Sequence, residues 1–168
     1  PDPDLRDSNN DIILSQALKM KPTVLAYAAS TQASKLGPHV GTAQIGGDPS
    51  EWLLKYPGIL RQTQILSLVA EGKGIVNSRS EVDGVVRRVP LVVGSGGKVY
   101  PSFALEMLRL GTGDISYQIK TGEFGVEWVR VPAYNKMNTD SNGNIWLNTN
   151  VKFYRQTAAE FMQNPMQA

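Results

Sequence analysis

Two adjacent arginines, Arg87 and Arg88, are the residues of this chain best suited to bind an anion. They interrupt residues 85–93, an otherwise apolar run, and a buried guanidinium needs a carboxylate, carbonyl or ligand oxygen as its partner. Carboxylates of the chain could supply that partner: Glu81, Asp83 or Glu106. Structural ion pairs of this kind are the commoner arrangement and the one that we expect. The alternative is that one arginine contacts an anionic ligand.

Tyr100 and Ser102 precede a predicted helix, and the free N–H groups at a helix N-terminus can also bind an anion. Both residues equally suit capping and packing of that helix, which is the more frequent role. For the ligand hypothesis we select five contacts, among which Asp83 would orient an arginine. They are Arg87, Arg88, Tyr100, Ser102 and Asp83.

Few residues of the chain suit catalysis or metal binding. Cysteine is absent, which excludes disulfides, thiolate metal sites and a cysteine nucleophile. The single histidine, His39, lies in a loop without a hydrophobic pattern, so we expect a solvated residue and not a catalytic base. Residues 140–151 begin like a calcium loop, but Ile145 and Val151 stand where that loop needs Gly and Glu. We predict no catalytic residue, metal or cofactor.

The composition indicates one ordinary globular domain. The chain has 168 residues and a hydrophobic content of 41%, which suffices for one core. Its 17 basic and 15 acidic residues give a net charge of +2 without a concentrated basic run, so no nucleic-acid partner is predicted. No apolar run approaches the ~18 residues that indicate a membrane span.

The arginines are positioned by a predicted hairpin and a helix. Residues 74–78 form its first strand, and Asp83-Gly84 suits a type I′ turn, in which both central residues need a positive φ. Residues 85–93 form a second strand that is apolar on both faces and therefore covered on both. Pro90 cannot donate to a ladder, so pairing on one side must stop or bulge there. The next helix begins at Pro101, and its predicted buried stripe is Phe103, Ala104, Met107, Leu108 and Leu110.

The segments before the hairpin alternate between helix and strand. A helix is predicted from a cap at residues 8–10 to Met20, and a buried, parallel strand over residues 23–29. Residues 30–58 lack a pattern but contain an apolar group around Trp52, so this loop is either functional or locally packed. A second helix is predicted over residues 60–70, stopped by Gly72-Lys73-Gly74.

The C-terminal third has the pattern of a β-meander. Its predicted strands span residues 116–120, 126–131 and 144–149, with Asn142-Gly143 as a hairpin signal and a short helix over residues 157–163. The sequence thus predicts an α/β fold, namely a mixed β-sheet with flanking helices. It contains a central hairpin followed by a helix and the C-terminal β-meander.

The central motif resembles a known family. Asp83 to Leu91 has the order D-G-x-x-R-R-x-P-L, and Tyr100 to Leu105 reads Y-P-S-F-A-L. A later segment with Asp140, Gly143 and Leu147-Asn148 fits a D-x-x-G…L-N pattern. This combination is similar to the second class of CHASE domains, extracellular sensory modules associated with bacterial cyclases and histidine kinases. The resemblance covers nearly the whole chain.

The resemblance implies one extracellular sensory domain over residues 1–168, on the periplasmic side of a bacterial inner membrane. Family members carry a further α/β segment and membrane helices, which we expect to lie outside this sequence. The resemblance implies an unidentified small-molecule or protein stimulus, a homodimeric receptor, and an adenylate or guanylate cyclase as output. A histidine or serine/threonine kinase is the alternative output. A small hydrolase-like enzyme is a further alternative, although no nucleophile motif supports it.

Overall fold

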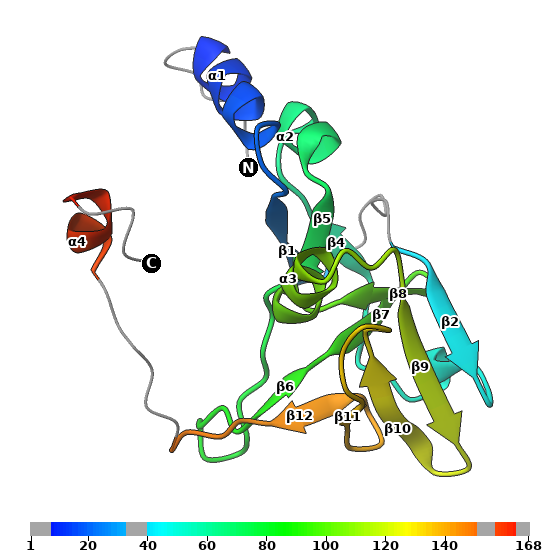
Figure 1. Cartoon of the computed structure of the whole chain (residues 1–168). Helices are drawn as coiled ribbons and strands as arrows, with labels where there is room; N and C mark the ends of the chain where they lie inside the picture. The colour runs from blue at the N-terminus through cyan, green and yellow to red at the C-terminus, as the bar shows by residue number, and fades with distance from the viewer. Residues whose placement is uncertain (1–7, 33–39, 151–156, 164–168) are drawn as a thin grey trace.

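A computed structural model describes residues 8–32, 40–150 and 157–163 (Figure 1). Its helices are α1 (Ser8–Leu18), α2 (Gln64–Val69), α3 (Phe103–Gly111) and α4 (Ala158–Gln163), with a 3-10 turn, η1 (Pro49–Glu51). Its strands are β1 (Val24–Ser30), β2 (Thr42–Ile45), β3 (Lys55–Tyr56), β4 (Gly58–Leu60), β5 (Gly72–Ile75), β6 (Arg88–Pro90), β7 (Val92–Ser95), β8 (Lys98–Pro101), β9 (Tyr117–Gly122), β10 (Gly125–Arg130), β11 (Met137–Asn138) and β12 (Asn144–Trp146). The described part is mixed α/β, which confirms the predicted fold class.

The strands form small sheets with the orders β4-β1-β5, β11-β10-β9-β2, β12-β6 and β3-β7-β8. Strand β1 is central in the first sheet, parallel to β5 and antiparallel to β4. The parallel strand predicted over residues 23–29 is therefore confirmed, although Tyr27 is the one residue of β1 that is fully buried. Strand β5 contains Gly74 and Ile75 of the strand predicted over residues 74–78, but it pairs with β1 and not with residues 85–93, so the predicted hairpin pairing is wrong.

Two glycines explain why α3 lies so close to β5. A Cβ atom at Gly72 would lie 3.0 Å from Glu106 Cγ, and one at Gly74 would collide with the Phe103 backbone. Helix α3 therefore packs directly on this strand because neither residue has a side chain. From the sequence, the two glycines were predicted to stop a helix and Gly74 also to begin a strand, but their role in the packing of α3 was not predicted.

The predicted strand over residues 85–93 is divided at Leu91. Strand β6 pairs with β12, whereas β7 pairs with β3 and β8. Pro90 ends β6, as expected for a residue without a backbone N–H. The two-sided cover predicted for this strand is right for β7, which is buried throughout, and wrong for residues 85–87, which belong to no strand.

Strands β7 and β8 form a tight hairpin around Gly96 and Gly97. Their φ angles of 54° and 73° are the two positive values that a type I′ turn requires. This turn type was predicted at Asp83-Gly84, but there Gly84 alone has a positive φ. Strand β8 ends at Pro101, which was assigned to the following helix.

Helix α3 begins at the N-cap Ser102, whose Oγ accepts a hydrogen bond from Leu105 N at 3.2 Å. Its buried residues are Leu105, Glu106 and Arg109. Met107 of the predicted apolar stripe is instead 53% exposed. That prediction failed because Glu106 and Arg109 pair with each other, so that two charged residues occupy the buried face.

The C-terminal part confirms two strands of the predicted meander and corrects the third. Strands β9 and β10 form an antiparallel hairpin, flanked by β2 and β11. Strand β12 pairs with β6 instead, with Ile145 opposite Val89. Hydrophobic alternation indicates that a segment is a strand but carries no information about a distant partner, which is why this pairing was not predicted.

Two hydrophobic clusters form the core. The larger one is built by β7, β8, α3, β9 and β10 and contains Leu53, Leu91, Val92, Val99, Leu105, Tyr117, Ile119, Val126, Val129 and Val131. The smaller one contains Tyr27, Ile59, Ile75, Val93 and Tyr100. Of the unpatterned segment over residues 30–58, the described part around Trp52 is locally packed, because Leu53 enters the larger cluster and Trp52 lies against it.

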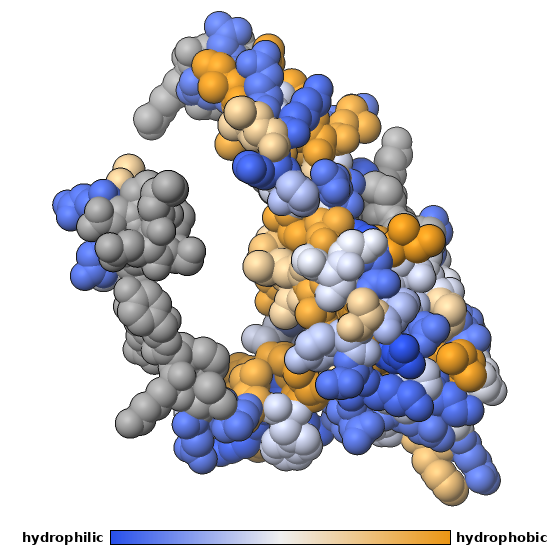
Figure 2. Space-filling model, in the orientation of Figure 1, coloured by the Kyte–Doolittle hydropathy of each residue, from blue (hydrophilic) through white to orange (hydrophobic). Residues whose placement is uncertain are grey.

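Helices α1 and α2 contact each other and project from one end of the sheet that contains β1 (Figure 1). Helix α1 confirms its prediction with an end at Leu18, whereas α2 starts at Gln64 because residues 58–60 form β4. Large apolar side chains are exposed on these helices and the turn after α1, at Ile12, Ile13, Leu14, Met20 and Leu68, and this end carries hydrophobic patches in Figure 2. None of the helices in the described residues has the length and apolar character to cross a membrane.

Candidate ligand-binding site

Residues 81–85 form a tight turn directly before the two arginines. Gly84 N donates to Glu81 O, and Glu81 N donates to Val85 O, both at 2.9 Å. With a φ of 79° at Gly84 only, this is a three-residue loop with glycine in the left-handed region. The turn brings the carboxylates of Glu81 and Asp83 within hydrogen-bond distance of the arginines.

Residues 140–144 form a second turn with the same hydrogen-bond pattern. Gly143 N donates to Asp140 O at 3.0 Å, Asp140 N donates to Asn144 O at 2.9 Å, and the φ of Gly143 is 78°. Asp140 Oδ1 also accepts from the backbone N–H groups of Asn142 and Asn144. Burial alone raises the pKa of Asp140, but these hydrogen bonds and the one from Arg88 outweigh burial and lower that pKa.

Arg88 joins the two turns. Its Nε and Nη2 donate to the two carboxylate oxygens of Glu81 at 2.8 and 3.0 Å, and its Nη1 donates to Asp140 Oδ2 at 3.1 Å. The guanidinium also lies 5.3 Å from the ring centroid of Trp146 in β12. The hydrogen bonds from Arg88 hold the pKa of Glu81 below its ordinary value. We name Glu81, Arg88 and Asp140 together the Arg88 bridge.

The predicted ion pairs are confirmed for two of the three carboxylates. Arg87 donates to both carboxylate oxygens of Asp83, at 2.9 and 2.7 Å, on the open surface. Glu81 pairs with Arg88 as described. Glu106 was a wrong candidate, because it lies on the buried face of α3 and pairs with Arg109 on the same helix.

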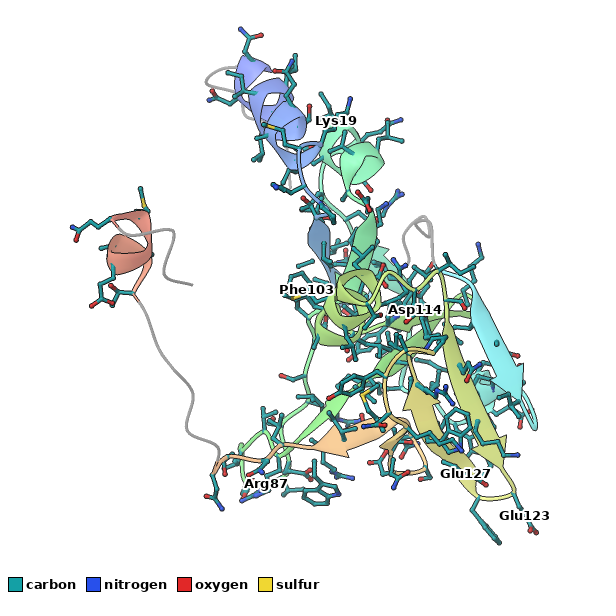
Figure 3. All side chains as sticks on the ribbon, in the orientation of Figure 1. Lys19, Arg87, Phe103, Asp114, Glu123 and Glu127 are labelled. Atoms are coloured by element: carbon teal, nitrogen blue, oxygen red, sulfur yellow. The ribbon has the colours of Figure 1, made fainter. Side chains whose placement is uncertain are left out.

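The other two predicted contacts lie elsewhere. Tyr100 is 1% exposed in the smaller core cluster, where burial, with a lesser effect of Tyr27, raises its pKa. Ser102 is half-buried and caps α3. Figure 3 labels Phe103 beside α3 and Arg87 at the end near β6, so the structure does not bring Ser102 together with the arginines.

A groove of about 630 Å³ opens beside the Arg88 bridge, within the size range of small-ligand sites. Its lining includes residues 51–55 and 79–82, together with Arg88, Pro90, Asn142 and Asn144. Asn142 Nδ2 donates to Trp52 O at 2.6 Å, which ties the second turn to the first lining segment. The groove is therefore bordered by segments that direct hydrogen bonds hold in place.

Asp140 was not predicted as a partner of Arg88, and Trp52, Lys55 and Arg79 were not predicted as groove residues. The groove residues lie in segments without a periodic pattern. One signal was present: the segments E-V-D-G from Glu81 and D-S-N-G from Asp140 share an acidic residue followed by an Asx-Gly pair. The acidic residue that begins each segment is therefore a candidate partner for the same arginine.

The chemistry that the groove provides is non-covalent binding by guanidinium, ammonium, carboxylate and amide groups. Within the residues that the structure describes, no group of three or more His, Cys, Asp or Glu side chains is placed to hold a metal ion. The start of the apparent calcium loop is engaged in other contacts, since Asp140 accepts from Arg88, Asn142 and Asn144. His39 lies outside the described residues, and its predicted role stays a prediction.

The comparison with known families agrees with the central motif. A family model described as the CHASE2 domain matches residues 1–167. No curated protein and no solved structure matches the chain. CHASE2 domains are extracellular sensory domains found in signalling receptors. The resemblance inferred from the motif is thereby confirmed, and the chain belongs to the CHASE2 domain family.

Proposed function

We propose that this chain is the sensory domain of a bacterial transmembrane receptor whose cytoplasmic output is an adenylate or guanylate cyclase. The match to the CHASE2 domain over residues 1–167 carries the proposal, since that family is sensory and occurs in signalling receptors. The domain would lie on the periplasmic side of the inner membrane. It would bind its stimulus without transforming it.

The groove is the place where we propose that the stimulus is received. Glu81 and Arg88 line it, and Arg88 also holds Asp140, which begins the turn into β12. An occupant that attracts either side chain would favour one arrangement of β12 over another and shift their populations. Among the five contacts predicted from the sequence, Arg88 lines the groove. Asp83 and Arg87 are not part of the lining but are close in sequence to the lining residues Val82 and Arg88.

We propose a homodimer as the working receptor. Cyclase outputs act in pairs, and a symmetric dimer would convert equal changes at β12 in both copies into a relative movement of the two outputs. The proposed signal therefore passes from the groove through the Arg88 bridge and β12 to the membrane segments.

The full-length protein, expressed in membranes, tests this proposal through cyclic AMP and cyclic GMP formation. We expect cyclase activity that changes severalfold in Arg88→Met, because that variant removes the link between the turns. Lys98→Gln, an exposed cation outside the groove, serves as the control and should behave like wild type.

Two other outcomes decide against the proposal in different ways. Phosphate transfer from ATP to a histidine, serine or threonine would replace the cyclase by a kinase. A full coding sequence without any membrane span or output domain would contradict the receptor itself.

A further inference from the structure

Two cations that line the groove have no carboxylate partner in the described part of the chain. Lys55 and Arg79 come from different lining segments, and both side chains are exposed. Neither forms an ion pair with any described residue. Lys55 acts only at longer range on Asp48, whose pKa is lowered chiefly by the hydrogen bonds from Ser50. Both cations are therefore free to meet a charge that enters the groove.

The acidic side chains of the lining do not cancel these cations. The charged side chains of the lining are Lys55, Arg79, Arg88, Glu51 and Glu81. Glu81 is neutralised by its bidentate pair with Arg88, which leaves Glu51 as the remaining carboxylate of the lining. Asp140 shares Arg88 with Glu81 and adds a negative charge just outside the lining. The attraction for an anion therefore rests on the two unpaired cations, Lys55 and Arg79, and not on the net charge of the groove.

The rest of the lining is suited to an apolar group. Trp52, Leu53, Leu54, Val82 and Pro90 border the same space. Ligand sites commonly combine such apolar surface with a few placed polar groups that orient the ligand. This apolar part of the lining favours an organic anion over an inorganic one.

We propose that the groove binds a small organic anion, whose carboxylate or phosphate group lies between Lys55 and Arg79 and whose apolar part lies against Trp52. The ligand class rests on the proposed role of the groove as the receiving site. Arg88 borders the same space, so the bound anion competes with Glu81 for its guanidinium. Binding is thereby linked to the Arg88 bridge.

Three probes of similar size and different charge test the ligand class on the 168-residue chain. Benzoate and phenyl phosphate carry the two anionic groups, and benzamidine carries a cation on the same ring. Backbone amide NMR shifts of Lys55, Ser80 and Glu81 are followed in a titration. We expect saturable shifts with at least one anion, with a Kd on the order of 1 mM for so small a probe, and no saturation with benzamidine.

Charge variants locate the site. Arg79→Gln and Lys55→Gln should each weaken binding of the anionic probe roughly tenfold, as expected for the loss of one charge-assisted contact. Glu51→Gln should tighten binding, because it removes the remaining negative charge. Lys98→Gln is the matched control and should leave the Kd unchanged. All four positions are exposed, and each variant's amide spectrum shows whether it is folded.

The inference is overturned if neither anion saturates, if benzamidine binds as well as benzoate, or if both Arg79→Gln and Lys55→Gln leave the Kd unchanged. A preference for phenyl phosphate over benzoate would assign a phosphate ligand, and the reverse a carboxylate. These measurements need no output domain. Failure of anion binding is therefore distinguishable from failure of the receptor cyclase proposal.

Discussion

Arg88 and Arg109 hold their partners with the same hydrogen-bond arrangement. In each, Nε and Nη2 bind both oxygens of a glutamate, and Nη1 binds an oxygen of an aspartate residue. The partners are Glu81 and the Asp140 carboxylate for Arg88, and Glu106 and the Asp114 backbone carbonyl for Arg109. The difference between the two sites therefore lies in their surroundings.

Burial separates the two arrangements. The side chains of Arg109 and Glu106 are 7% and 0% exposed, whereas those of Arg88 and Glu81 are 37% and 28% exposed. A buried pair that loses one partner leaves an uncompensated charge, but a half-exposed pair exchanges partners with water or a ligand. Glu106 also accepts from Lys73 N at 3.2 Å and so fixes α3 to β5. The buried pair stabilises the fold, and the exposed one is suited to regulation.

The largest effect is expected at the buried pair. Glu106→Gln leaves Arg109 buried without a charged partner and should lower the free energy of unfolding by roughly 3–5 kcal/mol. Urea denaturation followed by circular dichroism measures the loss. Glu123→Gln, at the exposed β9–β10 turn labelled in Figure 3, is the control. Equal stability of the two variants would refute the distinction between the arginine sites.

The two similar turns should differ in their tolerance of a methyl group. Gly84→Ala meets nothing within 4 Å and should cost only the left-handed φ, about 1–2 kcal/mol. At Gly143 the added Cβ would lie 2.9 Å from Leu53 Cδ2 and 3.2 Å from Val92 Cγ2, which should cost roughly 1–3 kcal/mol more. Paired denaturation curves measure the difference. A Gly84→Ala variant as unstable as Gly143→Ala would contradict the packing of the second turn.

Acid should open the Arg88 bridge. The folded-state pKa values of Glu81 and Asp140 are lowered, so their contribution to stability is complete above the unfolded values and is lost as pH falls through the folded ones. The Arg88 Nε–H resonance should therefore start to move only as the pH falls below about 4. In Glu81→Gln the resonance should already differ at neutral pH. A resonance that does not respond between pH 5 and pH 1, about the span over which salt-bridged carboxylates protonate, would show that Arg88 is not held by these carboxylates.

The smallest effect is expected at the surface pair of Arg87 and Asp83. Both side chains are about half exposed, at 45% and 53%, so solvent screens their attraction. Arg87→Gln should leave the urea midpoint unchanged within error. A clear loss of stability would mean that this pair, and not only the Arg88 bridge, holds the 81–85 turn.

The local part of the site could be predicted from the sequence because its partners are close in the chain. Glu81 and Asp83 precede the arginines by a few residues, and the turn between them is marked by Gly84. Asp140 is 52 residues from Arg88, and their meeting depends on the pairing of β12 with β6. Residue spacing does not reveal such a pairing.

The fold was predictable where one physical signal dominated. The apolar run of β1 and the alternation of β9 and β10 indicated strands correctly. At β5 and α3 two signals competed. Gly72 and Gly74 resembled a helix stop but provide space for α3, and Glu106 was a candidate partner of Arg87 or Arg88 but is neutralised in the core by Arg109. Both cases depend on tertiary packing.

Arg88 is proposed to couple the groove to β12. Amide and indole NMR spectra of Glu81→Gln test it directly, with Asp83→Asn as the control in the same turn. Glu81→Gln should shift the indole N–H of Trp146 and the amides of residues 140–144, whereas Asp83→Asn should affect only residues near the 81–85 turn. Shifts confined to residues 79–88 in both variants would contradict the coupling.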